Sequence, residues 1–309
     1  MKILLILALA FLGRTALGDT HHPSPAPPAD NGFQSLFPDD VEDYWARDAD
    51  GVELDVPYVP TPMNVVEAIL ELGRVGPGDI LYDLGCGDGR IVIAAAKYFG
   101  VPGVGVDLDP RRIEDSLENA AIDGVEDLVT FYVADIFETD FSEASVVAIY
   151  LLPSVNLELR PHLLEQLRPG SRVVSHQFHM GEWEPDHHLE VESIYDVADL
   201  YLWLIPAPVE GNWNGEITAG DDRLPISFFL AREFQQVWGA VKLEEVTAPV
   251  REGRLRGTGI SLDIGDLDFE GAKVSLRFLG EVEGDRASGL VLIENGRWTG
   301  VYPWEASRR

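Results

Sequence analysis

The chain has 309 residues, of which 46% are hydrophobic and 25% are charged, as in a globular protein with one large domain or two ordinary ones. Acidic residues outnumber basic ones by 53 to 23, so the formal net charge is -30. A surface this negative repels phosphate backbones, which argues against a nucleic-acid partner and favours cationic partners such as lysine-rich protein segments. Cys86 is the only cysteine, which excludes an intramolecular disulfide.

The first 18 residues have the pattern of a signal peptide. Lys2 precedes the apolar run Ile3–Leu12, and Ala16 and Gly18 are the small residues of a cleavage site. A run of about ten apolar residues is too short to span a bilayer, and no later segment is long and apolar enough to do so. We therefore expect an exported or periplasmic protein with no stable membrane span after cleavage. The alternatives are an uncleaved anchor and a misassigned start codon, and the second would give a cytoplasmic protein.

Three further regions follow the signal peptide. Residues 19–56 are first proline-rich and then acidic, as in an extended lead-in. Residues 57–206 alternate short apolar runs with helical segments, beginning with a helix near Pro62 for which Thr61 is the expected N-cap. Strands are predicted at 80–84, 103–107, 128–133, 145–151 and 172–175, and further helices at 90–98, 110–121 and 156–167. Continuous apolar strands between helices indicate an α/β domain with a mostly parallel sheet covered on both faces.

Residues 207–309 lose the helical periodicity. Short alternating apolar runs are separated by glycines, and tryptophans are spread through the region. This pattern predicts a small antiparallel β domain, either a barrel or a sandwich.

A glycine-rich turn follows the first predicted strand, with Asp83 at the strand end and Gly85, Gly87 and Gly89 in the turn. Glycines there allow positive φ and let a ligand approach free backbone N–H groups at a helix N-terminus. A dinucleotide site would need a further glycine where Arg90 stands, and Asp88 would repel a pyrophosphate. S-adenosylmethionine carries no phosphate but has a sulfonium and an ammonium group, so these acids favour it as the cofactor.

Two more acids end the next strands. Asp107 follows Gly87 by 20 residues, the spacing that places a carboxylate beside the ribose hydroxyls. Asp135 ends the following strand, where it could accept from the adenine amine. Ligands bind at the carboxyl edge of such sheets, so we expect Asp83, Asp107 and Asp135 to converge there.

The chain resembles the class I, seven-strand S-adenosylmethionine-dependent methyltransferases over about residues 55–205. In particular it is similar to the protein lysine methyltransferases of archaeal and mitochondrial type and to bacterial methyltransferase-domain proteins of unassigned substrate. The segments that carry this resemblance are Pro57–Pro62, Tyr82–Val92, Tyr150–Pro153 and Arg172–His176. It implies a Rossmann-like sheet with one antiparallel edge strand, within Leu200–Ile205. It also implies that the segment Tyr58–Thr61 closes over the methionine end of the cofactor and that Tyr150 lines the acceptor channel.

The function that follows is methyl transfer to a protein lysine or a comparable amine. Tyr58 and Tyr150 are the candidate acceptor-site residues, with core packing as their alternative role. Tyr150-Leu151-Leu152-Pro153 replaces the Asn/Asp-Pro-Pro-aromatic motif that enzymes acting on adenine or glutamine amides often carry. An exported nucleoside- or protein-binding module with this fold remains an alternative, because S-adenosylmethionine is made in the cytoplasm. A small-molecule methyltransferase is a further alternative that the motifs do not exclude.

Four histidines lie close enough in sequence to be candidate metal ligands. They are His176, His179, His187 and His188, but their spacing matches no zinc pattern on one helical face. We therefore expect no metal, and we expect His176 to pack or hydrogen-bond beside the site.

Overall fold

The computed structural model describes residues 58–193, 197–269 and 271–309. The predicted signal peptide, residues 1–18, and the lead-in, residues 19–56, lie outside the described residues. None of the described helices is long and apolar enough to cross a membrane.

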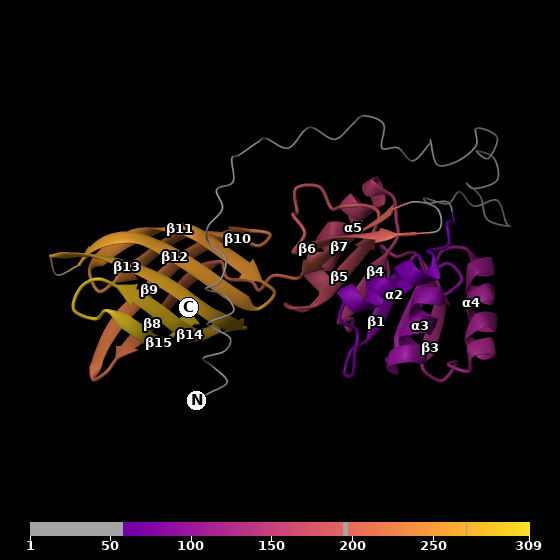
Figure 1. The fold of residues 1–309 in the computed structure, drawn as a ribbon, viewed down its shortest axis with the longest axis horizontal. Coiled ribbons are helices and arrows are strands. Elements are labelled where there is room, and N and C mark those ends of the chain that lie inside the picture. Colours follow the sequence, from indigo (N-terminus) through magenta and orange to yellow (C-terminus); the bar gives the residue numbers. More distant parts are fainter. Residues whose placement is uncertain (1–57, 194–196, 270) are drawn as a thin grey trace. The chain divides into compact units, whose positions relative to one another are not determined.

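The first described part of the chain is built on a seven-stranded sheet with the order β3-β2-β1-β4-β5-β7-β6 (Figure 1). Strands β1 to β5 run parallel to one another, whereas β7 is antiparallel to both of its neighbours, β5 and β6. The mostly parallel sheet with one antiparallel strand is therefore confirmed. The strands are β1 (Leu81–Leu84), β2 (Gly103–Asp107), β3 (Val129–Val133), β4 (Val146–Ile149), β5 (Arg172–His176), β6 (His187–Glu192) and β7 (Val197–Leu204).

The edge beyond β7 differs from the expectation. The antiparallel strand β7 lies one place in from the edge, and β6, which was not predicted, is the edge strand itself. Most side chains of β6 are exposed, so this strand lacks the apolar run that marked the other strands.

The described residues of this part form a helix before β1, α2 (Met63–Leu72), and three helices between strands, α3 (Arg90–Phe99), α4 (Pro110–Asp123) and α5 (Pro153–Gln166). The cap of α4 follows the usual pattern, because the Asp109 side chain accepts from the Arg111 amide at 3.0 Å and Pro110 is the first helical residue. The expectation that Thr61 caps α2 was wrong. Pro62 occupies the N-cap position with no side-chain cap, and the Thr61 side chain is directed to His176 instead.

The sheet has two separate apolar faces, because successive side chains of a strand point to opposite sides. Leu81, Val146 and Ala148 pack with apolar residues of α2, α3 and α4. The alternate residues Val147 and Ile149 pack with residues of α5 on the other face. Burial on both faces explains why these strands are continuously apolar. It also leaves the carboxyl edge of the sheet as the place where polar side chains meet.

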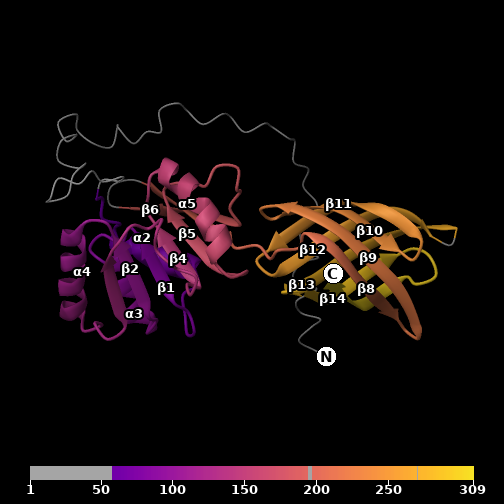
Figure 2. The ribbon, with the colours of Figure 1, turned by 180° about the vertical axis from the view of Figure 1, so that it is seen from behind.

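The C-terminal part is a closed antiparallel barrel of eight strands (Figure 2). Each strand pairs with the next in sequence, and β15 pairs with β8 to close the ring. The sequence predicted either a barrel or a sandwich, and the observed form is the barrel. Its strands are β8 (Gly211–Ala219), β9 (Asp222–Glu233), β10 (Gln236–Leu243), β11 (Val246–Arg256), β12 (Gly259–Phe269), β13 (Ala272–Glu283), β14 (Arg286–Glu294) and β15 (Gly300–Arg308).

The barrel interior is filled by side chains. Phe228, Phe278 and Trp304 lie at its centre, with ring centroids 5.1 to 5.5 Å apart. Their edge-on and tilted contacts are those that aromatic rings prefer in a packed core. Gly215 lies on the closing seam opposite Ala306, and a Cβ there would come within 1.8 Å of the Glu305 carbonyl oxygen. Only glycine allows the two strands to approach this closely.

We predict that Gly215→Ala opens the seam between β8 and β15 and lowers the free energy of unfolding of the barrel by about 1–3 kcal/mol, because overpacked backbone must shift. Urea denaturation followed by tryptophan fluorescence measures this change. Gly76→Ala is the matched control, because the nearest atom to a Cβ there is 4.0 Å away. Equal stabilities of the two variants would contradict the role of Gly215 in closure.

Candidate functional site

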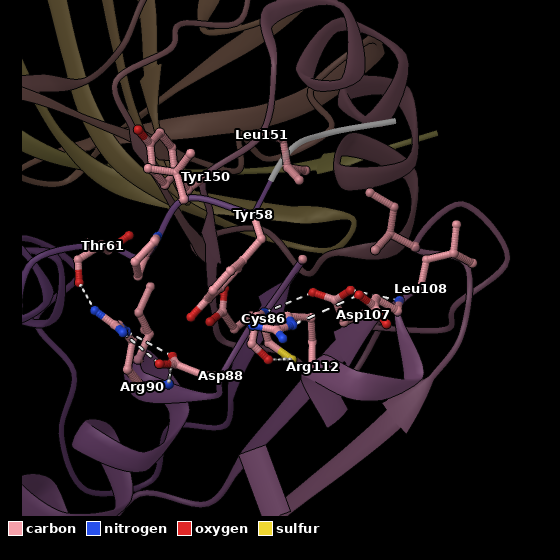
Figure 3. A pocket seen from close by; sticks show the side chains of 18 of the residues that line it. Tyr58, Thr61, Cys86, Asp88, Arg90, Asp107, Leu108, Arg112, Tyr150 and Leu151 are labelled. Atoms are coloured by element: carbon pink, nitrogen blue, oxygen red, sulfur yellow. Dashed lines mark hydrogen bonds and ion pairs between the residues drawn. The ribbon is translucent and has the colours of Figure 1, made fainter. Parts of the chain in front are cut away.

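The ends of β1, β2 and β4 and the segment before α2 surround one open cavity of about 980 Å³, a volume that includes the space at its mouth (Figure 3). All nine residues that the sequence singled out line this cavity. They are Tyr58, Thr61, Asp83, Gly85, Gly87, Asp88, Asp107, Asp135 and Tyr150.

The glycine turn is tied to the neighbouring strand by its own backbone. The amides of Gly85 and Cys86 donate to the Val106 carbonyl at 2.8 and 2.9 Å. Gly87 adopts a φ of 54°, and a Cβ there would lie 2.5 Å from the Tyr58 ring. Glycine is thus required at position 87 both for the left-handed backbone and for the close approach of Tyr58.

Asp107 fixes the turn from the end of β2. Its Oδ2 accepts from the Gly87 amide and its Oδ1 from the Asp109 amide, both at 2.9 Å. Burial raises the pKa of Asp107, although these two hydrogen bonds oppose the shift. A carboxylate offers about four acceptor positions, so each oxygen retains capacity for a ligand hydroxyl.

Asp83 is the most deeply buried acid of the site, with 2% of its surface exposed. Burial raises its pKa to about 8, and the negative charges of Asp107 and Asp88 add to the shift. Within the described residues its carboxyl group receives no hydrogen bond. Asp83 is therefore a carboxyl group that a cationic ligand would stabilise in its ionised form.

Asp88 has a partner of opposite charge. The Arg90 guanidinium contacts both of its oxygens, with Nη2–Oδ2 at 2.6 Å and Nε–Oδ1 at 2.8 Å, and its Nη1 donates to the Thr61 carbonyl at 2.7 Å (Figure 3). Burial acts to raise the pKa of Asp88, but the hydrogen bonds and charge of Arg90 outweigh it and lower the pKa. Arg90 thus joins the glycine turn to the segment before α2.

Tyr58 lies between Asp88 and Arg112. Burial and then the nearby Asp88 carboxylate raise the pKa of Tyr58, and the Arg112 guanidinium lies 4.4 Å from the centre of the Tyr58 ring. A cation over a tyrosine face is a favourable contact. The sequence identified Arg90 only as a residue that stands where a dinucleotide site needs glycine. It did not identify Arg112 as a residue of the site. The position of Arg112 in the first turn of α4, just after Asp107, could have suggested its place at the site.

Asp135 lies at the exposed rim of the cavity. Its Oδ1 accepts from the Phe137 amide at 2.8 Å, so the residue also shapes the turn after β3. Its neighbours Ala134 and Ile136 form part of the cavity wall beside it. The turn-forming role and a ligand contact are compatible, because one oxygen suffices for the turn.

An aromatic wall stands at the end of β4, where Tyr150 lines the cavity and His176 and Phe178 lie behind it. The Tyr150 ring lies 3.9 Å from the His176 ring and 6.3 Å from the Phe178 ring, measured between centroids. His176 Nδ1 lies 3.3 Å from Thr61 Oγ1. The expectation that His176 packs and hydrogen-bonds beside the site is confirmed. Burial lowers the pKa of His176 to about 4, so its ring is neutral at physiological pH.

Metal-ligating side chains do not gather in the part of the chain that the structure describes. Within residues 58–193, 197–269 and 271–309, no group of three or more His, Cys, Asp and Glu side chains is placed to hold a metal ion.

The sheet order, the glycine turn and the acids at three strand ends define the class of the protein, an S-adenosylmethionine-dependent methyltransferase of class I. A family model described as the ANTKMT methyltransferase domain matches residues 83–187. A solved RNA methyltransferase of Salinibacter ruber, in complex with S-adenosyl-L-homocysteine, is 52% identical and covers 49% of this chain and 96% of its own, with a TM-score of 0.47.

Similarity to known lysine methyltransferases identifies the family to which the chain belongs within this class. A protein-lysine N-methyltransferase of Saccharolobus islandicus is 46% identical over 151 residues, which are 48% of this chain and 94% of that enzyme. The adenine nucleotide translocase lysine N-methyltransferase of Mus musculus is 35% identical over 134 residues, which are 43% of this chain and 58% of the mouse protein. The chain belongs to the protein-lysine N-methyltransferase family. The expected class, family and cofactor are therefore confirmed.

We predict that cofactor affinity rises with pH up to about 8 and then levels off. A cationic cofactor binds better to ionised Asp83, and the pKa of about 8 in the free site keeps this group largely protonated at pH 7. Binding at pH 7 should therefore release a proton. Calorimetry with S-adenosylmethionine between pH 6 and 9, in buffers of different ionisation enthalpy, measures both effects.

Asp83→Asn is the isosteric test of this assignment. It should weaken cofactor binding and abolish the pH dependence. It should also stabilise the ligand-free protein, because the raised pKa of Asp83 means that stability falls as pH rises from about 4 towards 8. An affinity that does not change between pH 6 and 9 in the unmodified protein would show that Asp83 does not respond to the cofactor.

Proposed function

We propose that the protein transfers a methyl group from S-adenosylmethionine to the ε-amine of a lysine in a protein substrate. The observation that carries the proposal is that one cavity contains both a set of acids suited to the cofactor and an aromatic wall beside which an amine could enter. Family membership supports the same reaction.

The residues at the cavity fit the cofactor. Gly87 lets the Tyr58 ring pack directly on the turn, and the buried carboxyl of Asp83 suits the cationic methionine end. We assign the backbones of Gly85, Gly87 and Thr61 to the cradle that holds the methionine end of the cofactor. We assign Asp88 to the same end of the cofactor. Asp107 would accept from the ribose hydroxyls and Asp135 from the adenine amine, as oxygens with remaining acceptor capacity.

The chemistry requires little of the protein beyond alignment and a dry pocket. S-adenosylmethionine would supply the methyl group from its sulfonium, and the sulfur would keep the electron pair of the broken C–S bond and leave as the neutral thioether S-adenosylhomocysteine. The lysine ammonium must lose a proton to water before its nitrogen attacks. Burial raises the pKa of Tyr58 and of Tyr150, so both hydroxyls stay protonated at neutral pH and act as hydrogen-bonding and aromatic surfaces rather than as bases. We assign these two tyrosines to the acceptor site.

The charge of the chain supports a protein acceptor over a nucleic acid. A net charge of -30 repels phosphate backbones and attracts lysine-bearing segments. The exclusion of nucleic acid is part of the proposal.

The reaction is tested by incubating the purified chain with methyl-labelled S-adenosylmethionine and a cell-envelope extract. We expect label on a protein band that yields methyllysine after acid hydrolysis. Nuclease-sensitive label would assign RNA as the acceptor, and label confined to small molecules would assign a small-molecule methyltransferase. Cofactor binding without any transfer would favour a binding module.

Asp107→Asn should weaken S-adenosylmethionine binding roughly 10- to 100-fold, because charge-assisted hydrogen bonds contribute about 1.5–3 kcal/mol. Labelling of the band at subsaturating cofactor should fall in proportion. Asp127→Asn is the matched control, since Asp127 is exposed and does not line the cavity. Calorimetry measures both variants, and unchanged affinity in Asp107→Asn would remove Asp107 from the cofactor site.

We also propose that residues 1–18 direct export and are then removed, on the basis of the apolar run after Lys2. N-terminal sequencing of the protein isolated from its native cell should begin at Asp19. A sequence that begins at Met1 would contradict removal of the signal peptide.

A further inference from the structure

His176 lies outside the cavity lining yet contacts both sides of the site. The residue ends β5 and is 4% exposed. One edge of its ring faces the segment before α2, and one face of its ring lies against Tyr150. Neither contact is needed to complete the fold of β5, whose pairing with β4 and β7 is made by the backbone.

The contact on the cofactor side is with Thr61. His176 Nδ1 and Thr61 Oγ1 are 3.3 Å apart, and Thr61 is also only 4% exposed. The Thr61 carbonyl accepts from Arg90, which in turn holds Asp88 on the glycine turn. His176 is therefore joined to Asp88 on the cofactor turn through three consecutive polar contacts, by way of Thr61 and Arg90. Because both side chains are buried, removal of either one leaves the other without its hydrogen-bond partner.

The contact on the acceptor side is with Tyr150. The ring centroids are 3.9 Å apart with 36° between the ring planes, so the two rings are in close contact. Tyr150 lines the cavity, whereas His176 lies behind it. The histidine ring therefore limits how far Tyr150 can move away from the acceptor.

The backbone around His176 is held in a specific and strained form. Gln177 adopts a φ of 69°, which is unusual for a residue other than glycine, and its amide donates to the Asp199 carbonyl at 2.6 Å. The buried Asn156 Nδ2 contacts Ser175 Oγ at 3.3 Å and the Phe178 carbonyl at 3.2 Å. Strained backbone that is fixed by several partners is typical of functional sites. This turn sets the direction of the His176 ring.

We propose that His176 is a positioning residue that links the cofactor-binding segment at Thr61 to the acceptor wall at Tyr150, so that an ordered cofactor site also orders the acceptor site. The acceptor half of this inference rests on the proposed function, whereas the cofactor half does not. The two contacts use different parts of the ring, so they can be removed one at a time.

His176→Phe keeps a ring against Tyr150 but removes Nδ1. We expect the Kd for S-adenosylhomocysteine to rise roughly 5- to 100-fold, because the Thr61 hydroxyl loses its buried partner. The kcat at saturating cofactor should stay within about twofold. His176→Asn keeps a polar atom near the position of Nδ1 but removes the ring. Its Kd should stay near that of the unmodified protein, while kcat on the labelled protein band falls roughly 10- to 100-fold, because Tyr150 is no longer held in place.

Thr61→Val removes the other partner of the polar contact and should raise the Kd as His176→Phe does. The double variant with both changes leaves no unpaired group, so it should bind S-adenosylhomocysteine more tightly than either single variant. This recovery separates a specific contact from a general loss of stability, and thermal melts record the latter.

The inference is overturned if Thr61→Val binds S-adenosylhomocysteine like the unmodified chain, or if the double variant shows the sum of the two losses. Equal losses of affinity and kcat in His176→Phe and His176→Asn would also contradict it. If the unmodified chain labels no protein, the proposed function fails, but the Kd measurements still decide whether His176 supports the cofactor site.

Discussion

The site is organised around the burial of the Asp83 carboxyl group. A carboxyl group at the end of a central strand, enclosed on both faces of the sheet, loses its hydration and gains no hydrogen bond from the described residues. The neighbouring acids have partners that Asp83 lacks: backbone amides donate to Asp107, and Arg90 forms an ion pair with Asp88. Among the acids that line the cavity, Asp83 alone has no such partner in the described residues, so the free site favours a ligand that carries positive charge.

Because both faces of the sheet are buried, the Asp83 carboxyl group is held at the end of its strand. Residues of the central strands alternate between a core with α2, α3 and α4 and a core with α5, so most of their positions are apolar. The acids Asp83 and Asp107 lie at the carboxyl ends of β1 and β2. The segment between Tyr58 and Thr61 then closes the cavity, held by Arg90 on one side and by His176 on the other. The glycine turn and Tyr150 are thus connected through a few side chains of long sequence separation.

The sequence predicted the parts of this arrangement that depend on local pattern. The apolar runs located the parallel strands, and the acids and glycines at their ends located the cavity, because ligands of such sheets bind at the carboxyl edge. Contacts between distant segments were not predictable in this way. Arg112 over Tyr58 and Arg90 on Thr61 depend on how the segment before α2 folds back, which no local pattern encodes. Thr61 matched the preference for an N-cap, but its hydroxyl is used in a tertiary contact instead. The edge strand β6 has too few buried side chains to produce a strand pattern.

The closed barrel has a consequence for how this protein can meet others. A sheet with a free edge can add a strand from another chain, as β3 and β6 could at the two edges of the methyltransferase sheet. In the barrel each strand from β8 to β15 is paired on both sides, so no backbone donors remain along an edge. Recognition by the barrel must therefore depend on its side chains and connecting turns. Such surfaces can change residue by residue without disturbing the ladder of hydrogen bonds beneath them.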